Sequence, residues 1–361
     1  MKRIHVLVVD DSAVMRQVTA AVLSRDPELV VTPAADPIIA QEKMARQRPD
    51  VILLDLEMPR MDGLTFLRQI MRDDPLPVVI CSGYAERGTR RAMEALEAGA
   101  LDIVQKPQVG VREFLEESAV TLIEAIRGAA EAGARRRVGP IAPPPGKLTA
   151  DAVLPLRKIP PSNAVRSGRL VTMGASTGGT EALVQILSAL PADFPALAIA
   201  QHMPAGFTGG FAKRLDGLSR IEVKEAQDGD ALFAGRALIA PGGRHLLIER
   251  GAGGYRARVI DGPLVARHRP SVDVLFRSVA QVAGRDATGV LLTGMGDDGA
   301  TGLKELRDAG AETIAQDEAS CVVFGMPRAA IQRGAASRVL PLGSIATELV
   351  VAETRARGTG R

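Results

Sequence analysis

The amino-acid sequence predicts an α/β protein built from two mostly parallel sheets. Three observations lead to this prediction. Short apolar runs alternate with amphipathic helical patterns over residues 4–125, the same alternation resumes after residue 168, and a proline-rich stretch lies between. Strands that alternate with helices usually pair in parallel, with the helices covering the sheet. A chain of 361 residues suits about two such domains.

The first region contains five apparent βα units. Residues 13–25, 91–97 and 111–130 have helical spacing of apolar side chains, and the last pattern is long enough to close a domain. We therefore expect a first domain over 1–127 with a flavodoxin-like, five-stranded parallel sheet. The clearest apolar runs are 6–9, 51–54, 77–81 and 101–105.

Acidic residues follow two of these runs: Asp10 and Asp11 after the first, and Asp55 after the second. Open α/β sheets bind ligands at the carboxyl ends of their strands. Three carboxylates within about 4 Å would repel by roughly 4 kcal/mol per pair at an effective dielectric constant near 20. A hard cation such as Mg²⁺ would relieve this repulsion. Ser82 and Lys106 end the next two runs, and the whole set suits metal-assisted capture of a phosphoryl group.

This constellation, with the motifs VVDDS, LLDLEMPRMDGL and the Lys106-Pro107 pair, resembles the receiver domain of two-component response regulators. The resemblance implies that Asp55 accepts the phosphoryl group, that Asp10 and Asp11 hold Mg²⁺ together with it, and that Ser82 and Lys106 sense the modification. One position departs from the family pattern. Many receivers carry an aromatic residue three positions before the lysine, and this chain has Ile103 there.

Residues 128–167 are predicted to be a linker. The stretch is rich in proline, including Pro143, Pro144 and Pro145, and it has no sustained apolar period. Proline density favours extended, semi-rigid chain. The arginines at 135–137 could alternatively form a docking patch for nucleic acid.

The second domain is predicted over 168–355. Runs of buried-strand character recur at 170–173, 196–200, 237–239 and 289–292, which indicates a doubly wound, mostly parallel sheet. Residues 246–260 contain glycines between two alternating segments, so we expect an antiparallel β-hairpin set into this second sheet.

The first of these strands runs into Gly-Ala-Ser-Thr-Gly-Gly, which places Ser176 on a tight turn before a helical pattern. A serine in that position has an exposed hydroxyl close to several backbone N–H groups, as an acyl-transfer nucleophile requires. The turn also half-matches a dinucleotide-binding fingerprint, with Asp193 near the distance expected for a ribose contact. Ser176 stands where the middle glycine would be, and a side chain there obstructs a pyrophosphate.

His202 and Asp298 follow two other strands of the same predicted sheet. Histidine is a natural proton acceptor near neutral pH, and a carboxylate that holds its second nitrogen fixes the tautomer. His268 is the next candidate base, ahead of His5 and His245, and Asp297 is the rival orienting acid. The order Ser, His, Asp differs from that of α/β-hydrolases, chymotrypsin and subtilisin.

Longer motifs, among them GASTGG, QHMPAGFT, DGPxVxRHRPSVDVLF and LLTGMGDDGATGL, resemble the catalytic domain of chemotaxis receptor methylesterases, the CheB family. The resemblance implies a triad of Ser176, His202 and Asp298, with an oxyanion site formed by backbone around Thr177 and Met295. Asp297 departs from the family, because enteric relatives have asparagine at that position.

The resemblance further implies hydrolysis of glutamate γ-methyl esters on methyl-accepting chemotaxis receptors, deamidation of glutamines there, and a chemotaxis histidine kinase as phosphodonor. The esterase itself needs no cofactor. A second hypothesis is regulatory: the unphosphorylated receiver covers the Ser176 edge, and phosphorylation of Asp55 activates the esterase. A different class stays open, in which the serine site is vestigial and the output is protein docking.

Composition and the N-terminal sequence narrow the functional classes and the locations that remain possible. The formal net charge is +3 with 24% charged residues, which favours neither disorder nor strong nucleic-acid binding. We expect no DNA-binding output, because the second region shows βα alternation. The N-terminus does not read as a secretory signal and no stretch suits a membrane span. Cys81 and Cys321 lie in different predicted domains, so we expect reduced thiols and a cytoplasmic protein without membrane insertion.

Overall fold

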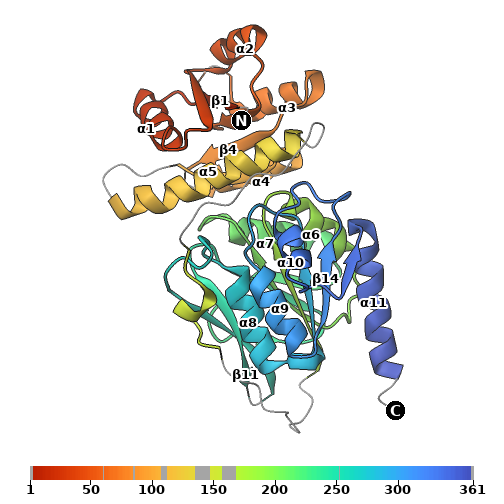
Figure 1. The fold of residues 1–361 in the computed structure, drawn as a ribbon. Coiled ribbons are helices and arrows are strands. Elements are labelled where there is room, and N and C mark those ends of the chain that lie inside the picture. Colours follow the sequence, from red (N-terminus) through yellow and green to blue (C-terminus); the bar gives the residue numbers. More distant parts are fainter. Residues whose placement is uncertain are drawn as a thin grey trace. The chain divides into compact units, whose positions relative to one another are not determined.

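The computed structural model (Figure 1) describes residues 3–59, 61–83, 86–106, 112–134, 147–156, 168–251 and 253–358. The chain divides into two compact units, residues 1–143 and 144–361. Pro107 of the lysine–proline pair and the arginines at 135–137 lie outside the described residues. No helix in the described part of the chain has the length and apolar character that a membrane span requires.

The first unit contains a five-stranded parallel sheet in the order β2-β1-β3-β4-β5, as predicted. The strands β1, β3 and β4 are almost entirely buried, which explains their continuous apolar runs. The elements are β1 (Ile4–Val9), α1 (Ala13–Leu23), β2 (Leu29–Ala34), α2 (Pro37–Arg46), β3 (Val51–Leu54), α3 (Gly63–Asp73), β4 (Val78–Ser82), α4 (Glu86–Glu97), β5 (Asp102–Gln105) and α5 (Arg112–Ala134).

The second unit contains a seven-stranded parallel sheet in the order β15-β14-β13-β6-β7-β10-β8. Its central strands β6 and β7 are buried along their whole length, so other elements must cover both faces of the sheet. The strands of this sheet are β6 (Leu170–Ala175), β7 (Ala196–Gln201), β8 (Glu222–Glu225), β10 (Arg236–Ile239), β13 (Ala287–Leu291), β14 (Glu312–Gln316) and β15 (Arg338–Leu340). The helices are α6 (Gly179–Ser188), α7 (Thr208–Leu218), α8 (Val272–Val282), α9 (Ala300–Asp308), α10 (Met326–Gln332) and α11 (Leu342–Gly358), with short 3-10 helices at Ala150–Ala152 and Gly284–Asp286.

The predicted hairpin exists, but its place in the second sheet was predicted wrongly. Strands β11 (His245–Gly251) and β12 (Gly254–Ile260) pair with β9 (Ala231–Leu232) in a separate three-stranded antiparallel sheet. The physical reason is that alternate residues of β12 are buried, so the hairpin covers the core with one face and leaves the other in solvent.

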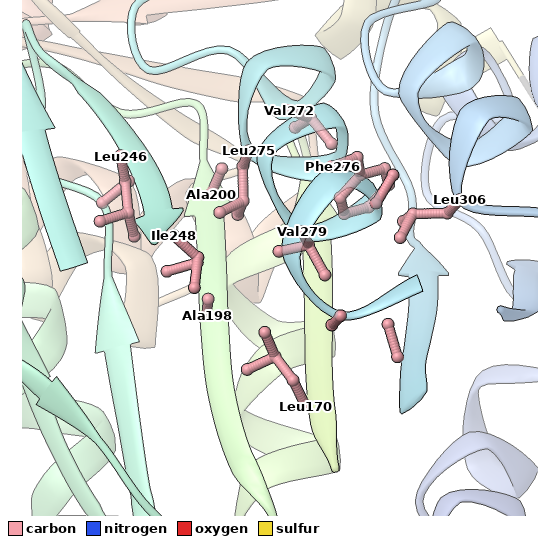
Figure 2. Packing of buried hydrophobic residues seen from close by; sticks show 14 of the residues in the cluster. Leu170, Ala198, Ala200, Leu246, Ile248, Val272, Leu275, Phe276, Val279 and Leu306 are labelled. Carbon is pink, nitrogen blue, oxygen red and sulfur yellow. The ribbon is translucent and has the colours of Figure 1, made fainter. Parts of the chain in front are cut away.

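Figure 2 shows how this layer and α8 pack against the large sheet. Leu170, Ala198 and Ala200 of the sheet lie in one buried cluster with residues of α8 and the hairpin. Phe276 of α8 is fully buried there. This packing fixes the N-terminal end of α8 relative to the strand ends, which is where the candidate catalytic residues lie. Other labelled members of the cluster are Leu246, Ile248, Val272, Leu275, Val279 and Leu306.

Two segments of the predicted 128–167 linker have ordered structure. Helix α5 continues to Ala134. Residues 147–156 belong to the second unit, where Ala150 is buried in a cluster with Leu247, Val265 and Val274. We refer to residues 147–156 as the docked segment.

Candidate active site and phosphoacceptor site

Ser176 lies in the turn between β6 and α6. Its N–H donates to the carbonyl of Thr293 at 3.0 Å, and its carbonyl accepts from the amide of Gln201 at 3.0 Å and from the N–H of Gly179 at 2.7 Å. Gly178 adopts φ of 78°, a left-handed conformation that favours glycine, and so allows the chain to turn sharply into the helix. The backbone around Ser176 is therefore held by three neighbouring segments.

His202 lies at the adjacent strand end. Ala175 and Gln201 are partners in the β6–β7 register, so Ser176 and His202 are the next residues along two paired strands. The N–H of His202 donates to the carbonyl of Ala175 at 3.0 Å. Its Nε2 lies 2.8 Å from Oδ2 of Asp298, while its buried Nδ1 has no hydrogen-bond partner among the described residues.

Asp298 is buried, and its carboxylate accepts five hydrogen bonds. Oδ2 accepts from His202 and from the N–H of Val272 at 2.7 Å. Oδ1 accepts from the Ser271 hydroxyl at 2.9 Å and from the N–H groups of Asp273 and Gly299, both at 3.0 Å. The carboxylate thus caps the N-terminus of α8, where the helix dipole favours negative charge.

These contacts keep Asp298 ionised. Burial opposes ionisation, but the hydrogen bond and charge of His202, the nearby His268 and the backbone N–H groups together lower the pKa of Asp298 to about 2. An ionised Asp298 makes His202 Nε2 the donor, because a carboxylate can only accept. Nδ1 of His202 then carries the free lone pair.

The loop after β13 brings the remaining predicted residues to this edge. A Cβ atom on Gly294 would lie 2.6 Å from Cβ of Ser176, which shows how closely the loop approaches the serine. Met295 lies next to Gly294, and the carbonyl of Thr177 accepts from the Thr293 hydroxyl at 3.0 Å. The backbone of Thr177 and Met295 is therefore near Ser176, on two different segments.

The rival acid, Asp297, faces other partners. Its Oδ1 pairs with Lys147 and its Oδ2 pairs with Arg333 at 3.0 Å. The structure therefore brings Asp298, and not its neighbour, to His202.

The rival histidines occupy distinct environments. His268 stacks on His202 with ring centroids 3.6 Å apart, and burial together with the nearby His202 holds the pKa of His268 well below its usual range. His245 is buried, with Nε2 2.9 Å from the carbonyl of Pro263. His5 lies in the first unit, where its Nε2 contacts the Thr32 hydroxyl at 2.7 Å.

The dinucleotide alternative conflicts with the topology. Asp193 precedes β7, so it lies at the amino end of the strand, whereas the glycine turn lies at the carboxyl end of β6. In a parallel pair these are opposite edges of the sheet. Asp193 therefore does not lie beside the glycine turn, as a ribose contact would require.

The candidate phosphoacceptor site is at the carboxyl edge of the first sheet. One carboxylate oxygen from each of Asp10, Asp11 and Asp55 lies within 4.8 Å of the others. Nζ of Lys106 is 2.6 Å from Asp55 Oδ2 and 3.0 Å from Asp10 Oδ2. Ser82 is buried at the end of the neighbouring strand β4.

Burial shapes the charges of this site. It raises the pKa of Asp55, although Lys106 opposes the shift. Burial also disfavours the charged lysine, but the hydrogen bond to Asp55 and the charge of Asp10 raise the pKa of Lys106. Asp11 is exposed. The three carboxylates supply the oxygen ligands that a hard divalent cation prefers, so the residues present fit Mg²⁺.

Three further residues at the catalytic edge were missed by sequence reasoning. Gln201 holds the Ser176 carbonyl, Ser271 holds Asp298, and Lys147 pairs with Asp297. Ser271 could have been found, because a serine before an apolar helical pattern is a capping signal. No sequence signal indicated Lys147, which lies in the predicted linker.

Comparison with known proteins adds the family context. A family model described as CheB methylesterase matches residues 171–349, and one described as response regulator receiver domain matches 6–117. The chain is 57% identical over 357 residues to protein-glutamate methylesterase/protein-glutamine glutaminase 3 of Geobacter metallireducens, covering 97% of this chain and 99% of the relative. It is 59% identical over 350 residues to protein-glutamate methylesterase/protein-glutamine glutaminase 5 of Anaeromyxobacter dehalogenans, covering 96% of each. Among solved structures, the Thermotoga maritima CheB methylesterase catalytic domain has 39% identity and a TM-score of 0.50, covering 51% of this chain and 98% of that one.

Proposed function

The chain belongs to the CheB methylesterase family and carries a receiver domain, and from this premise we propose that it is a phosphorylation-regulated protein-glutamate methylesterase. Its substrates are glutamate γ-methyl esters on methyl-accepting chemotaxis receptors in the cytoplasm, and it also deamidates glutamines there. The observation that carries the proposal is that Ser176 and His202 directly follow the paired strands β6 and β7, while His202 Nε2 lies 2.8 Å from Asp298 Oδ2.

The catalytic cycle follows from the hydrogen-bond pattern. Asp298 holds the Nε2–H of His202, so Nδ1 is the nitrogen that accepts the Ser176 proton. The serine oxygen attacks the ester carbonyl, and backbone N–H groups of Thr177 and Met295 stabilise the oxyanion. His202 then gives this proton to the methoxy oxygen, which leaves as methanol, or to the amide nitrogen of a glutamine, which leaves as ammonia, and the acyl-enzyme forms. Water, deprotonated by His202, hydrolyses the acyl-enzyme to glutamate and restores the serine.

Substitution of the nucleophile tests this cycle. Ser176→Ala should reduce the rate of methanol release from methylated receptor by several orders of magnitude, since triad residues act as a unit. Ser188→Ala is a matched control, because Ser188 is exposed on α6 and bonds only locally. Near-wild-type hydrolysis by Ser176→Ala would reject the assignment.

The receiver site supports control by phosphorylation of Asp55. Asp10, Asp11 and Asp55 would hold Mg²⁺, which when bound neutralises charge on the incoming phosphoryl group. Lys106, already paired with Asp55, would move to the phosphoryl oxygens, and Ser82 would respond at the neighbouring strand end. A chemotaxis histidine kinase is the natural phosphodonor. The added charge is about −1.5 to −2 by analogy with other phosphorylated residues, enough to bias a two-state element.

Regulation is tested by comparing methyl-ester hydrolysis before and after phosphorylation. The full chain is incubated with phosphorylated kinase and Mg²⁺, beside Asp55→Asn treated identically. We expect activation of the wild type only. Equal rates before and after treatment, with Asp55 shown to be phosphorylated by mass analysis, would refute the regulatory part and leave the esterase assignment intact.

The vestigial-serine alternative makes a different prediction. A serine-directed phosphonate should modify Ser176 if the hydroxyl is activated, and His202→Ala should suppress that modification. Absence of modification in the wild-type chain would favour a docking module over an esterase.

A further inference from the structure

The docked segment, residues 147–156, lies outside the region that the methylesterase family model matches, yet it packs on the catalytic unit. The N–H of Ala266 donates to the carbonyl of Leu148 at 2.8 Å. At its other end, the buried Arg277 of α8 donates to Asp151 at 2.7 Å and to the Leu154 carbonyl at 2.9 Å. These contacts fix the position at which the segment begins, Lys147.

Lys147 pairs with Asp297, the residue next to Asp298. Arg333, which follows α10, pairs with the other oxygen of the same carboxylate at 3.0 Å. Asp297 is therefore held between two cations from distant segments, while Asp298 points to His202 and α8. The two adjacent carboxylates therefore tie one loop to different segments.

The charge of Lys147 also acts on the catalytic groups. Burial lowers the pKa of Lys147, as do the nearby Arg267 and Arg333, whereas the charge of Asp298 opposes the shift. Lys147 is likewise one of the charges that disfavour the protonated form of His268, which stacks on His202. Its side chain is only 28% exposed, so solvent screens these interactions incompletely.

We propose that Lys147 is a positioning residue of the esterase: by pairing with Asp297 it fixes the 294–298 loop and offsets a negative charge beside the His202–Asp298 pair. The proposal rests on the proposed function. Without Lys147, the Asp297 carboxylate would lose one of the two cations that pair with it. The surplus negative charge would favour protonated imidazole, and His202 would be a base over a narrower pH range.

The charged and titratable groups around the His202–Asp298 pair come from four segments. Asp298 and Asp297 lie in the loop after β13, His268 and Arg267 precede α8, Lys147 belongs to the docked segment, and Arg333 follows α10. Of these, Lys147 and Arg333 bind Asp297 directly. Removal of the Asp297 charge should therefore cancel the effect that loss of Lys147 has on the protonation of His202. If Lys147 had only a structural role, Asp297→Asn would not cancel its loss.

The experiment uses the full chain with Lys147→Ala, Lys147→Arg, Asp297→Asn and the double variant Lys147→Ala/Asp297→Asn. We expect Lys147→Ala to shift the acid limb of the kcat/KM profile to higher pH and to reduce kcat/KM about fivefold on that limb. In Lys147→Arg and in the double variant, the acid limb of the kcat/KM profile should lie at its wild-type position. Lys304→Ala is the matched control, because Lys304 forms an exposed ion pair with Asp308 on α9.

A readout independent of activity separates this proposal from the proposed function. The chain has four histidines, so the His202 ring signal can be assigned by substitution and titrated by NMR in each variant. An upward shift of its midpoint in Lys147→Ala, reversed in the double variant, supports the proposal even if ester hydrolysis is absent. An unshifted midpoint, or a pH-independent loss of activity that Asp297→Asn does not rescue, would overturn it.

Discussion

His202 Nε2 and Asp298 Oδ2 lie 2.8 Å apart, although 96 positions separate the two residues in the sequence. The contact depends on α8, because Asp298 also accepts hydrogen bonds from Ser271, Val272 and Asp273 at the start of that helix. Asp298 is therefore held by a helix that contributes none of the three proposed catalytic side chains.

Replacement of Asp298 by asparagine, which has nearly the same shape as aspartate, should abolish most of the esterase activity. Asp298→Asn removes the charge that makes His202 Nε2 the donor, so Nδ1 loses its role as proton acceptor. We expect kcat to fall by about three to four orders of magnitude. Ester hydrolysis by Asp298→Asn is compared with that by Asp308→Asn, an exposed carboxylate on α9. A loss of less than tenfold would argue against Asp298 as the orienting residue.

Gly294 should tolerate no side chain. A Cβ atom there would lie 2.4 Å from Met326 Sδ and 2.6 Å from Ser176 Cβ. Gly294→Ala must displace the serine or the loop, so we expect lower kcat and a cost of about 1–3 kcal/mol in the free energy of unfolding. Gly217→Ala on α7 is the control, because a Cβ atom there meets nothing within 4 Å. Wild-type activity in Gly294→Ala would show that the loop at Gly294 lies less close to Ser176 than these distances indicate.

Asp273 should make the protein less stable as pH rises. Burial and the charge of Asp298 raise the pKa of Asp273 to about 7, above the value of about 3.9 for an unfolded chain. Between these values the folded state binds more protons, so the free energy of unfolding falls as pH rises from about 4 to about 7. Asp273→Asn keeps an oxygen for the Gly302 N–H, which lies 2.7 Å from Oδ1.

Thermal unfolding between about pH 4 and pH 7 tests this behaviour. The midpoint of Asp273→Asn should depend less on pH than that of the wild type. Asp298 adds no slope over most of this range, since its pKa is lowered and its contribution is lost only as pH falls from about 4 towards about 2. Identical slopes in wild type and Asp273→Asn would contradict the raised pKa.

Mg²⁺ should stabilise the receiver unit. A cation bound by Asp10, Asp11 and Asp55 raises the free energy of unfolding by about 2.7 kcal/mol at a hundredfold excess over Kd. The thermal midpoint of this unit should therefore rise with Mg²⁺ concentration. Asp11→Asn should weaken the response, whereas Asp73→Asn, an exposed carboxylate on α3, should not. An equal response in both variants would place the ion elsewhere.

The local features of this protein are readable from the sequence because they depend on short-range rules. The flavodoxin-like order of the first sheet, four strands of the second sheet (β6, β7, β10 and β13) and the hairpin at β11–β12 were predicted from apolar periodicity and glycine turns, whereas β8, β14 and β15 were not. Ser176, His202 and Asp298 could be proposed as a triad from the sequence because residues at the carboxyl ends of parallel strands share one edge of the sheet.

Tertiary structure alone decided the contacts between distant segments. It assigned Asp298 to His202 and Asp297 to Lys147 and Arg333, a choice that two adjacent aspartates in a sequence cannot reveal. It placed the hairpin in a separate sheet with β9 and brought the docked segment onto the catalytic unit. Such contacts become favourable only when folding has buried these segments and brought their charges together. No periodic pattern in the sequence indicates them.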